Sequence, residues 1–64
     1  MTERDLLRDR FSGMLETAQT AADEYHRLAG SAPDPATRSE LQRLARDQYR
    51  HMDLAQRLLE IVEE

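Results

Sequence analysis

Two side chains near the middle of the sequence could bind a proton or a metal ion. They are Gln48 and His51, and they stand within an otherwise apolar pattern. Residues three apart share one side of a helix, so the amide and the imidazole are expected to project together. Imidazole is a common ligand of transition metals, whereas Fe²⁺ prefers anionic oxygen alongside imidazole. The pair therefore suits either a metal site completed by carboxylates or a hydrogen-bonded contact between helices.

Three carboxylates are candidates for completing a metal site. Asp47 precedes His51 by four residues, which is a helical spacing for a shared ligand pair. Glu24 is expected nearer the turn than His51 is. Glu16 is expected to point away from its own hairpin, towards a neighbouring subunit. We therefore predict a metal site between subunits that uses His51, Gln48 and Glu16, with Asp47 as the alternative carboxylate.

The apolar pattern predicts a first helix over about residues 3–29. Apolar residues recur there at alternating spacings of four and three, which is typical of helices in antiparallel bundles. We expect Thr2 to cap its start and Gly30 to follow its end. The predicted contact stripe is Leu7, Phe11, Met14, Ala18, Ala21, Tyr25 and Leu28. Three further residues widen this stripe along one side: Leu15, Ala22 and Ala29.

The second helix is predicted over about residues 35–63, after a loop at 30–34. Asp34 stands before a proline, and this pair suits a helix start because Asp accepts hydrogen bonds from first-turn N–H groups. Thr37 and Glu40 offer a competing capping box three residues later. The contact stripe again alternates four and three: Leu41, Ala45, Gln48, Met52, Ala55, Leu59 and Val62. A parallel row lies on its flank: Leu44, His51 and Leu58.

The predicted architecture is all-α, an antiparallel two-helix hairpin in a single domain over residues 1–64. A chain of 64 residues is too short to build a large core, and without cysteine no disulfide can compensate. A metal ion or a second subunit is therefore needed. Four residues are expected along open apolar edges of the hairpin: Leu6, Leu15, Leu58 and Leu59. We expect the chain to dimerise into a four-helix bundle, or to form a ring of such dimers.

Charge and hydropathy restrict the partners. The net charge of −4 disfavours nucleic-acid binding, because that binding depends on neutralising phosphates. No apolar run approaches the ~20 residues needed to span a bilayer. We therefore expect no nucleic-acid partner, no membrane insertion and a cytoplasmic location.

Several features occur at the spacing of a known family. They are the hairpin length, the Asp34-Pro35 start of the second helix, Tyr25 and His51. Over roughly residues 11–62, the chain resembles the ferritin-like superfamily, and most closely its short two-helix members of encapsulated-ferritin or rubrerythrin type.

The family carries a Glu seven residues before the Tyr and a Glu-x-x-His on the next helix. Ala18 and Gln48 occupy these two Glu positions in this chain. The resemblance implies a di-iron cofactor and Fe(II) oxidation for iron storage. It also implies a location inside an encapsulin-type compartment, with the shell as a protein partner.

Two hypotheses of function follow. In the first, the protein is a ferritin-like iron-binding protein whose site lies between subunits at the bundle centre, with ferroxidase activity only where a neighbour supplies carboxylates. In the second, it is a metal-free structural or interaction hairpin that docks a partner. In that case Gln48 fixes the register and oligomeric state, as single polar residues in apolar stripes often do. His26 is expected at the outer margin of the first helix, solvated or in an ion pair.

Overall fold

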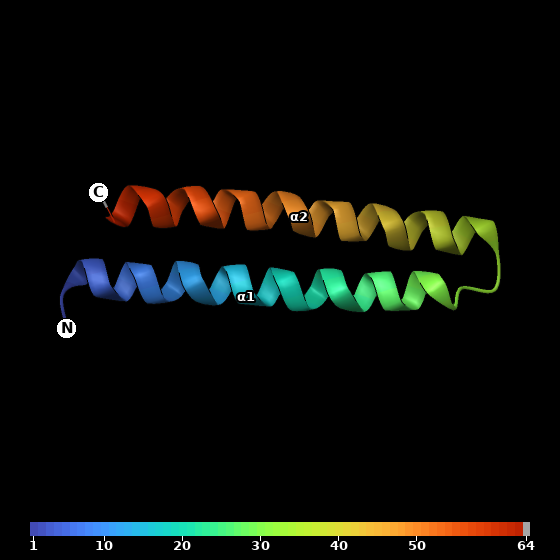
Figure 1. The fold of residues 1–64 in the computed structure, drawn as a ribbon, viewed down its shortest axis with the longest axis horizontal. Helices are drawn as coiled ribbons and strands as arrows, with labels where there is room; N and C mark the ends of the chain where they lie inside the picture. The colour runs from blue at the N-terminus through green and yellow to red at the C-terminus, as the bar shows by residue number, and fades with distance from the viewer. Residues whose placement is uncertain (64) are drawn as a thin grey trace.

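The chain forms a hairpin of two long antiparallel helices in the computed structural model, which describes residues 1–63 (Figure 1). Helix α1 spans Glu3–Gly30 and helix α2 spans Pro35–Glu63. The two termini lie at one end of the hairpin and the connection at the other. The predicted all-α class, with two helices packed against each other, is confirmed. Glu64, the last residue of the predicted domain, lies outside the described residues.

A capping box fixes the start of α1. The Thr2 hydroxyl accepts a hydrogen bond from the Asp5 N–H at 3.1 Å, and the Asp5 carboxylate accepts one from the Thr2 N–H at 3.2 Å. These bonds satisfy N–H groups that have no partner within the helix. They also lower the pKa of Asp5, with the Thr2 backbone N–H as the largest cause. The predicted N-cap at Thr2 is confirmed.

The end of α1 differs from the expected one. Gly30 was expected to follow the helix as a left-handed residue, and this is wrong: Gly30 is the last helical residue, and no residue in 1–63 has a positive φ. Ser31 is the C-cap, with φ −111° and ψ 12°, and its N–H donates to the carbonyl of Leu28 at 3.2 Å. A tightened last turn therefore satisfies the final carbonyls, and no left-handed residue is needed.

Helix α2 starts at the proline that follows Asp34. One Asp34 carboxylate oxygen accepts the Thr37 N–H at 2.7 Å, and the other accepts the Thr37 hydroxyl at 3.0 Å. The predicted Asp34 cap is therefore present. The competing capping box does not form, because Glu40 instead pairs with Arg43 one turn further along.

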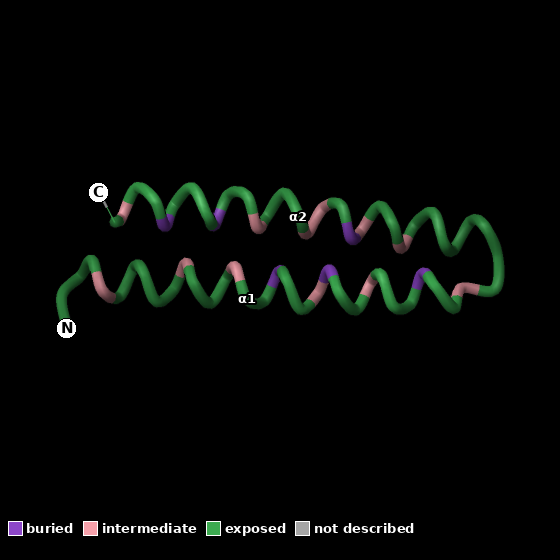
Figure 2. The backbone as a smooth tube through the Cα atoms, viewed as in Figure 1, coloured by how far each residue is buried: buried purple, intermediate pink, exposed green. Residues whose placement is uncertain are grey.

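Small residues fill the contact between the helices. Figure 2 shows that the buried positions of each helix face the other helix. The buried residues are Ala18, Ala22, Ala29, Ala45, Ala55 and Leu59. Alanine side chains let two helix backbones approach closely, since the separation of packed helices depends on the side chains between them. The same small side chains remove little apolar area from water.

The predicted contact stripe of α2 matches the burial pattern, but that of α1 matches it only in part. Leu7, Met14 and Leu28 were expected in the contact, yet they are 40%, 53% and 37% exposed. The contact keeps Ala18 of the predicted stripe and adds Ala22 and Ala29 of the widening row, with three larger residues half-buried beside them: Phe11, Leu15 and Tyr25. Compared with the predicted orientation, α1 is rotated about its own axis. Its alanines therefore meet α2, and Leu7, Met14 and Leu28 are exposed.

The predicted edge residues divide in a similar way. Leu6 and Leu58 are 50% and 36% exposed, as expected. Leu59 was expected at an edge and is buried, and Leu15 is half-buried. Both lie on the side of their helix that meets the other helix, so the expectation was wrong for these two residues.

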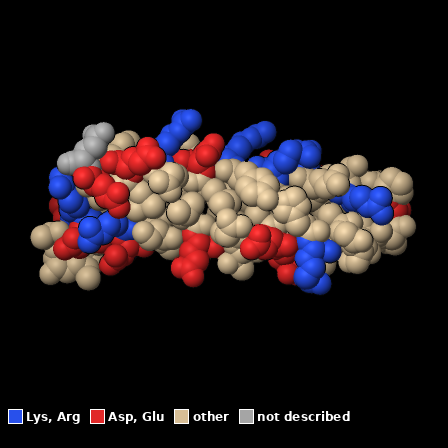
Figure 3. Space-filling view, in the orientation of Figure 1, with Lys and Arg blue, Asp and Glu red and all other residues tan. Residues whose placement is uncertain are grey.

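Charged side chains stabilise each helix separately. The five ion pairs found within residues 1–63 all join residues three or four apart on one helix. Figure 3 shows most charges along the outer edges of the face in view and at the end with the termini, with mostly uncharged residues along the middle of that face. Apolar packing, and not ion pairing, therefore holds the two helices together.

Enlarging a buried alanine should separate the helices. Ala45 is fully buried, so Ala45→Leu should lower the free energy of unfolding by about 1–3 kcal/mol through overpacking. Urea unfolding followed by circular dichroism measures this change. Ala36→Leu makes the same substitution at an exposed position of α2 and should leave stability nearly unchanged. Equal effects at both positions would contradict close packing at Ala45.

The Asp34 cap should make stability depend on acid pH. Hydrogen bonds from the Thr37 N–H and then the Thr37 hydroxyl lower the pKa of Asp34 below its ordinary value of 3.8. This stabilisation is therefore complete above about pH 4 and is lost as pH falls through the lowered pKa. Asn caps helices without titrating, so Asp34→Asn should reduce the fall in melting temperature between pH 5 and pH 2. Asp53→Asn, which removes an exposed carboxylate that caps no helix, should not reduce it.

Candidate functional site

An open groove on one side of the hairpin contains Gln48 and His51. Six residues of α1 line it opposite them: Arg10, Phe11, Gly13, Met14, Thr17 and Ala18. The amide and the imidazole therefore share one surface, as their spacing predicts. The three-residue step from Gln48 to His51 turns both side chains of α2 towards this side of the hairpin.

The walls of this groove are mainly apolar. Ala18 is buried at the helix contact and contributes only a methyl group beside Gln48 and His51. Ala18 and Gln48, which occupy the two Glu positions of the ferritin-like pattern, thus line the same groove as His51. No carboxylate lines the groove. Its metal-binding atoms are those of one imidazole and one amide, which is a poor donor set for iron.

Glu16 lies elsewhere on the surface. It lines a separate depression on α1, together with Thr17, Thr20, Ala21 and Glu24. The Glu24 carboxylate accepts a hydrogen bond from Arg27 Nε at 3.1 Å, and this bond lowers its pKa. A single hairpin therefore does not bring Glu16 to His51, and the predicted set of His51, Gln48 and Glu16 requires a second subunit.

Asp47 precedes His51 by four residues and lies on the same side of α2. It lines a second depression that also contains Gln48 and His51. Arg43 donates to Asp47 at 3.2 Å, and Arg50 lies 3.8 Å from its other oxygen. Its negative charge is thus balanced by two arginines. Within residues 1–63, no group of three or more His, Asp or Glu side chains is placed to hold a metal ion.

Large apolar side chains flank the groove. Met14 and His51 line it together, so the heptad rows that contain them lie on the same side of the hairpin. We call this side the apolar face, and it consists of Leu7, Met14, Ala21, Leu28, Leu44, His51 and Leu58. Four of these are large apolar residues that are at least one-third exposed: Leu7, Met14, Leu28 and Leu58. Contiguous exposed apolar side chains usually mark an interaction surface.

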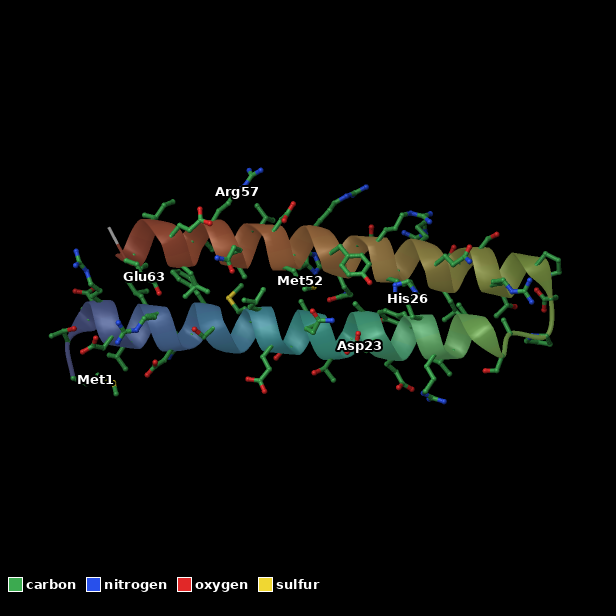
Figure 4. All side chains as sticks on the ribbon, viewed as in Figure 1. Met1, Asp23, His26, Met52, Arg57 and Glu63 are labelled. Atoms are coloured by element: carbon green, nitrogen blue, oxygen red, sulfur yellow. The ribbon has the colours of Figure 1, made fainter. Side chains whose placement is uncertain are left out.

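A hydrogen bond between the helices lies on the other side of the hairpin. His26 Nε2 and the Tyr49 hydroxyl are 2.8 Å apart, and their ring centroids are 5.7 Å apart. Figure 4 shows His26 projecting from α1 towards α2, whereas Arg57 projects away from the hairpin. Tyr49 is two residues before His51, about 200° away around the helix. This bond therefore leaves the apolar face uncovered.

The His26–Tyr49 pair was not predicted. His26 is exposed as expected, but its partner is a tyrosine and not an ion-pair partner. It is the only side-chain hydrogen bond that joins α1 to α2 in the described part of the chain. The sequence offered little indication of this pair, because Tyr49 lies outside the apolar stripe. Tyr49 meets His26 only because of the relative axial position of the two helices.

Comparison with models of known protein families, with curated proteins and with solved structures found no match for this chain. Neither helix, over residues 1–63, has the length and apolar content needed to cross a membrane. We therefore infer function from the groove and from the apolar face that surrounds it.

Removing the Tyr49 hydroxyl should weaken the hairpin only slightly. Tyr49→Phe loses an exposed hydrogen bond, for which we expect a cost of about 1 kcal/mol or less. A double-mutant cycle with His26→Ala, measured by thermal unfolding, isolates this bond. In the His26→Ala background, Tyr49→Phe should have no effect. An equal cost in both backgrounds would show that the hydroxyl acts through something other than His26.

Proposed function

We propose that this protein is a self-associating helical hairpin, in which two copies cover each other's apolar faces to form a four-helix bundle. The bundle serves as a structural or docking module and needs no metal ion. One observation carries the proposal: five of the six buried residues are alanines, while Leu7, Met14, Leu28 and Leu58 are exposed on one face. The larger apolar residues are placed where only another molecule could bury them.

The exposed area supports this proposal. A compact monomer of 7.4 kDa exposes about 4200 Å², whereas the hairpin exposes 4851 Å². The hairpin measures 49 by 16 Å across its broad faces, an area of about 800 Å², which is what each partner buries in an interface of standard size. One broad face thus provides enough surface for a stable dimer.

The charged residues also suit this arrangement. Arg43, Asp47 and Glu40 form ion pairs along α2 that stay within one helix. The contact between α1 and α2 is formed mainly by buried alanines, and the exposed residues of the apolar face lie beside it. A second copy therefore covers the apolar face without changing that contact. The proposed bundle therefore has an apolar centre and charged outer edges.

A second candidate is the iron-binding function implied by the ferritin-like resemblance. It is favoured by the position of Ala18, Gln48 and His51 in one groove, where a dimer would bring two imidazoles together. The donors of the groove alone do not fit a di-iron centre, because they include no carboxylate. Glu16 or Asp47 of a neighbouring subunit would have to complete the site, as for a ferritin-like protein inside an encapsulin-type shell. We rank this candidate second for that reason.

A charge on the apolar face should prevent self-association. Leu58→Glu places a carboxylate in the proposed interface, where its desolvation is unfavourable, and should raise the dimer dissociation constant at least about tenfold. Sedimentation equilibrium measures this constant. Gln56→Glu adds the same charge about 200° away around α2 and should leave it nearly unchanged. A wild-type chain that stays monomeric at high micromolar concentration would refute the proposal.

Native mass spectrometry with and without anaerobic Fe(II) separates the two candidates. The metal-free proposal predicts a dimer whose mass does not change on adding Fe(II). Iron binding predicts one or two metal ions per dimer, lost in His51→Ala while the helical circular dichroism signal stays the same. Metal retained by His51→Ala would exclude His51 as the ligand.

A further inference from the structure

The residues of α2 on and beside the apolar face are arranged symmetrically along the helix. Helix α2 spans Pro35–Glu63, so its centre lies close to Tyr49 and Arg50. Two pairs of residues, each at equal distances on either side of that centre, have matching chemistry and are at least partly exposed. The pairs are Leu41 with Leu58, and Gln48 with His51.

Such a pattern suits the pairing of a helix with its own copy. In a two-fold symmetric interface, residue i of one chain meets residue j of the other, and j meets i. When two α2 helices lie antiparallel with their centres aligned, Leu41 of one copy faces Leu58 of the other, and Gln48 faces His51. Apolar residues then meet apolar residues, and the two polar residues meet each other.

We propose that the occupant of the apolar face is a second copy of this chain, with the two α2 helices antiparallel and His51 of each copy hydrogen-bonded to Gln48 of the other. This inference rests on the proposed self-association and adds its register and orientation. The hydrogen bond occurs twice, because the two-fold axis passes between the two pairs. His51 and Gln48 are thus specificity-determining residues of the dimer.

The chemistry of the two side chains supports this pairing. A neutral imidazole has one N–H donor and one acceptor nitrogen, and a glutamine amide has both donors and an acceptor oxygen. Each can therefore satisfy the other within the apolar centre of the bundle. Both line the open groove in the hairpin, so neither has to leave a buried partner in order to form the bond.

Other arrangements leave these groups without partners. Shifting one α2 by seven residues would place Gln48 against Leu58, and would bury the polar atoms of the amide against methyl groups. Placing α2 against α1 of the other copy would set His51 against an apolar row that contains Met14. A buried polar group without a partner weakens association considerably. The centred antiparallel pairing avoids this cost.

Single-cysteine variants test the register, because the natural chain has no cysteine. Leu41→Cys and Leu58→Cys chains are mixed and oxidised mildly. A disulfide requires Cα atoms within about 7 Å, so the mixture should form the 41–58 heterodimer. Each variant alone should crosslink much less, because identical positions then lie 17 residues apart, about 25 Å along the helix. Arg46→Cys mixed with Asp53→Cys, a symmetric pair on the outer side of α2, should not crosslink.

The crosslinking results separate the antiparallel register of the dimer from self-association itself. A dimer that crosslinks at 41–41 and 58–58 is parallel and overturns the inference, as does a dimer with no crosslink in any mixture. In both cases self-association itself stands. If the wild-type chain is monomeric, both proposals fail. Sedimentation equilibrium of the reduced variants shows whether they still dimerise, so a crosslink lost through impaired association is recognised as such.

Variants of the polar pair test its role. Gln48→Leu and His51→Leu each leave one buried polar group unpaired and should raise the dimer dissociation constant about 5- to 100-fold. The double variant removes both groups. It should restore dimerisation while the 41–58 crosslink falls and other crosslinks appear. Additive effects of the two single substitutions would show that the residues do not contact each other, and would overturn the pairing.

Discussion

The close contact of alanines between the two helices determines the other features of this structure. Ala22, Ala45 and Ala55 are fully buried, and Leu59 is the one larger residue buried with the alanines in the described part of the chain. The hairpin is a single layer of two helices, and its Cα atoms extend over 10 Å along the shortest axis. Leu59 enters this contact, whereas other large apolar residues, among them Leu7, Met14 and Leu28, remain exposed on its flanks. The apolar face and the groove around His51 are therefore consequences of alanine packing.

The sequence was sufficient to predict the helices and their caps because these depend on local chemistry. The spacing of apolar residues defined two helices, and Thr2 and Asp34 cap them through hydrogen bonds to residues three positions away. Gly30 was misassigned because either a left-handed residue or a tightened turn can end a helix. Only the backbone conformation at Ser31 distinguishes the two.

The rotation of α1 could not be predicted from the pattern. Its apolar stripe is wide enough to meet α2 with Leu7 and Met14 or with Ala22 and Ala29, and the apolar spacing alone does not choose between these two orientations. Part of the candidate site could be predicted, because residues three apart share one side of a helix. This spacing places Gln48 and His51 in one groove. The relation of Glu16 to that groove depends on a second subunit, which one chain does not specify. The metal and oligomer hypotheses thus stay predictions.

The short connection at Ser31–Asp34 has a consequence for the motions of the hairpin. It ties α1 and α2 together at one end, while both termini lie at the other. Opening therefore starts at the free end, where each successive turn can separate without disturbing the turns nearer the connection. Amide hydrogens should exchange with solvent fastest near Glu3 and Glu63, and slower towards the alanine contacts. Such graded opening is typical of a structure whose stability is distributed unevenly along its length.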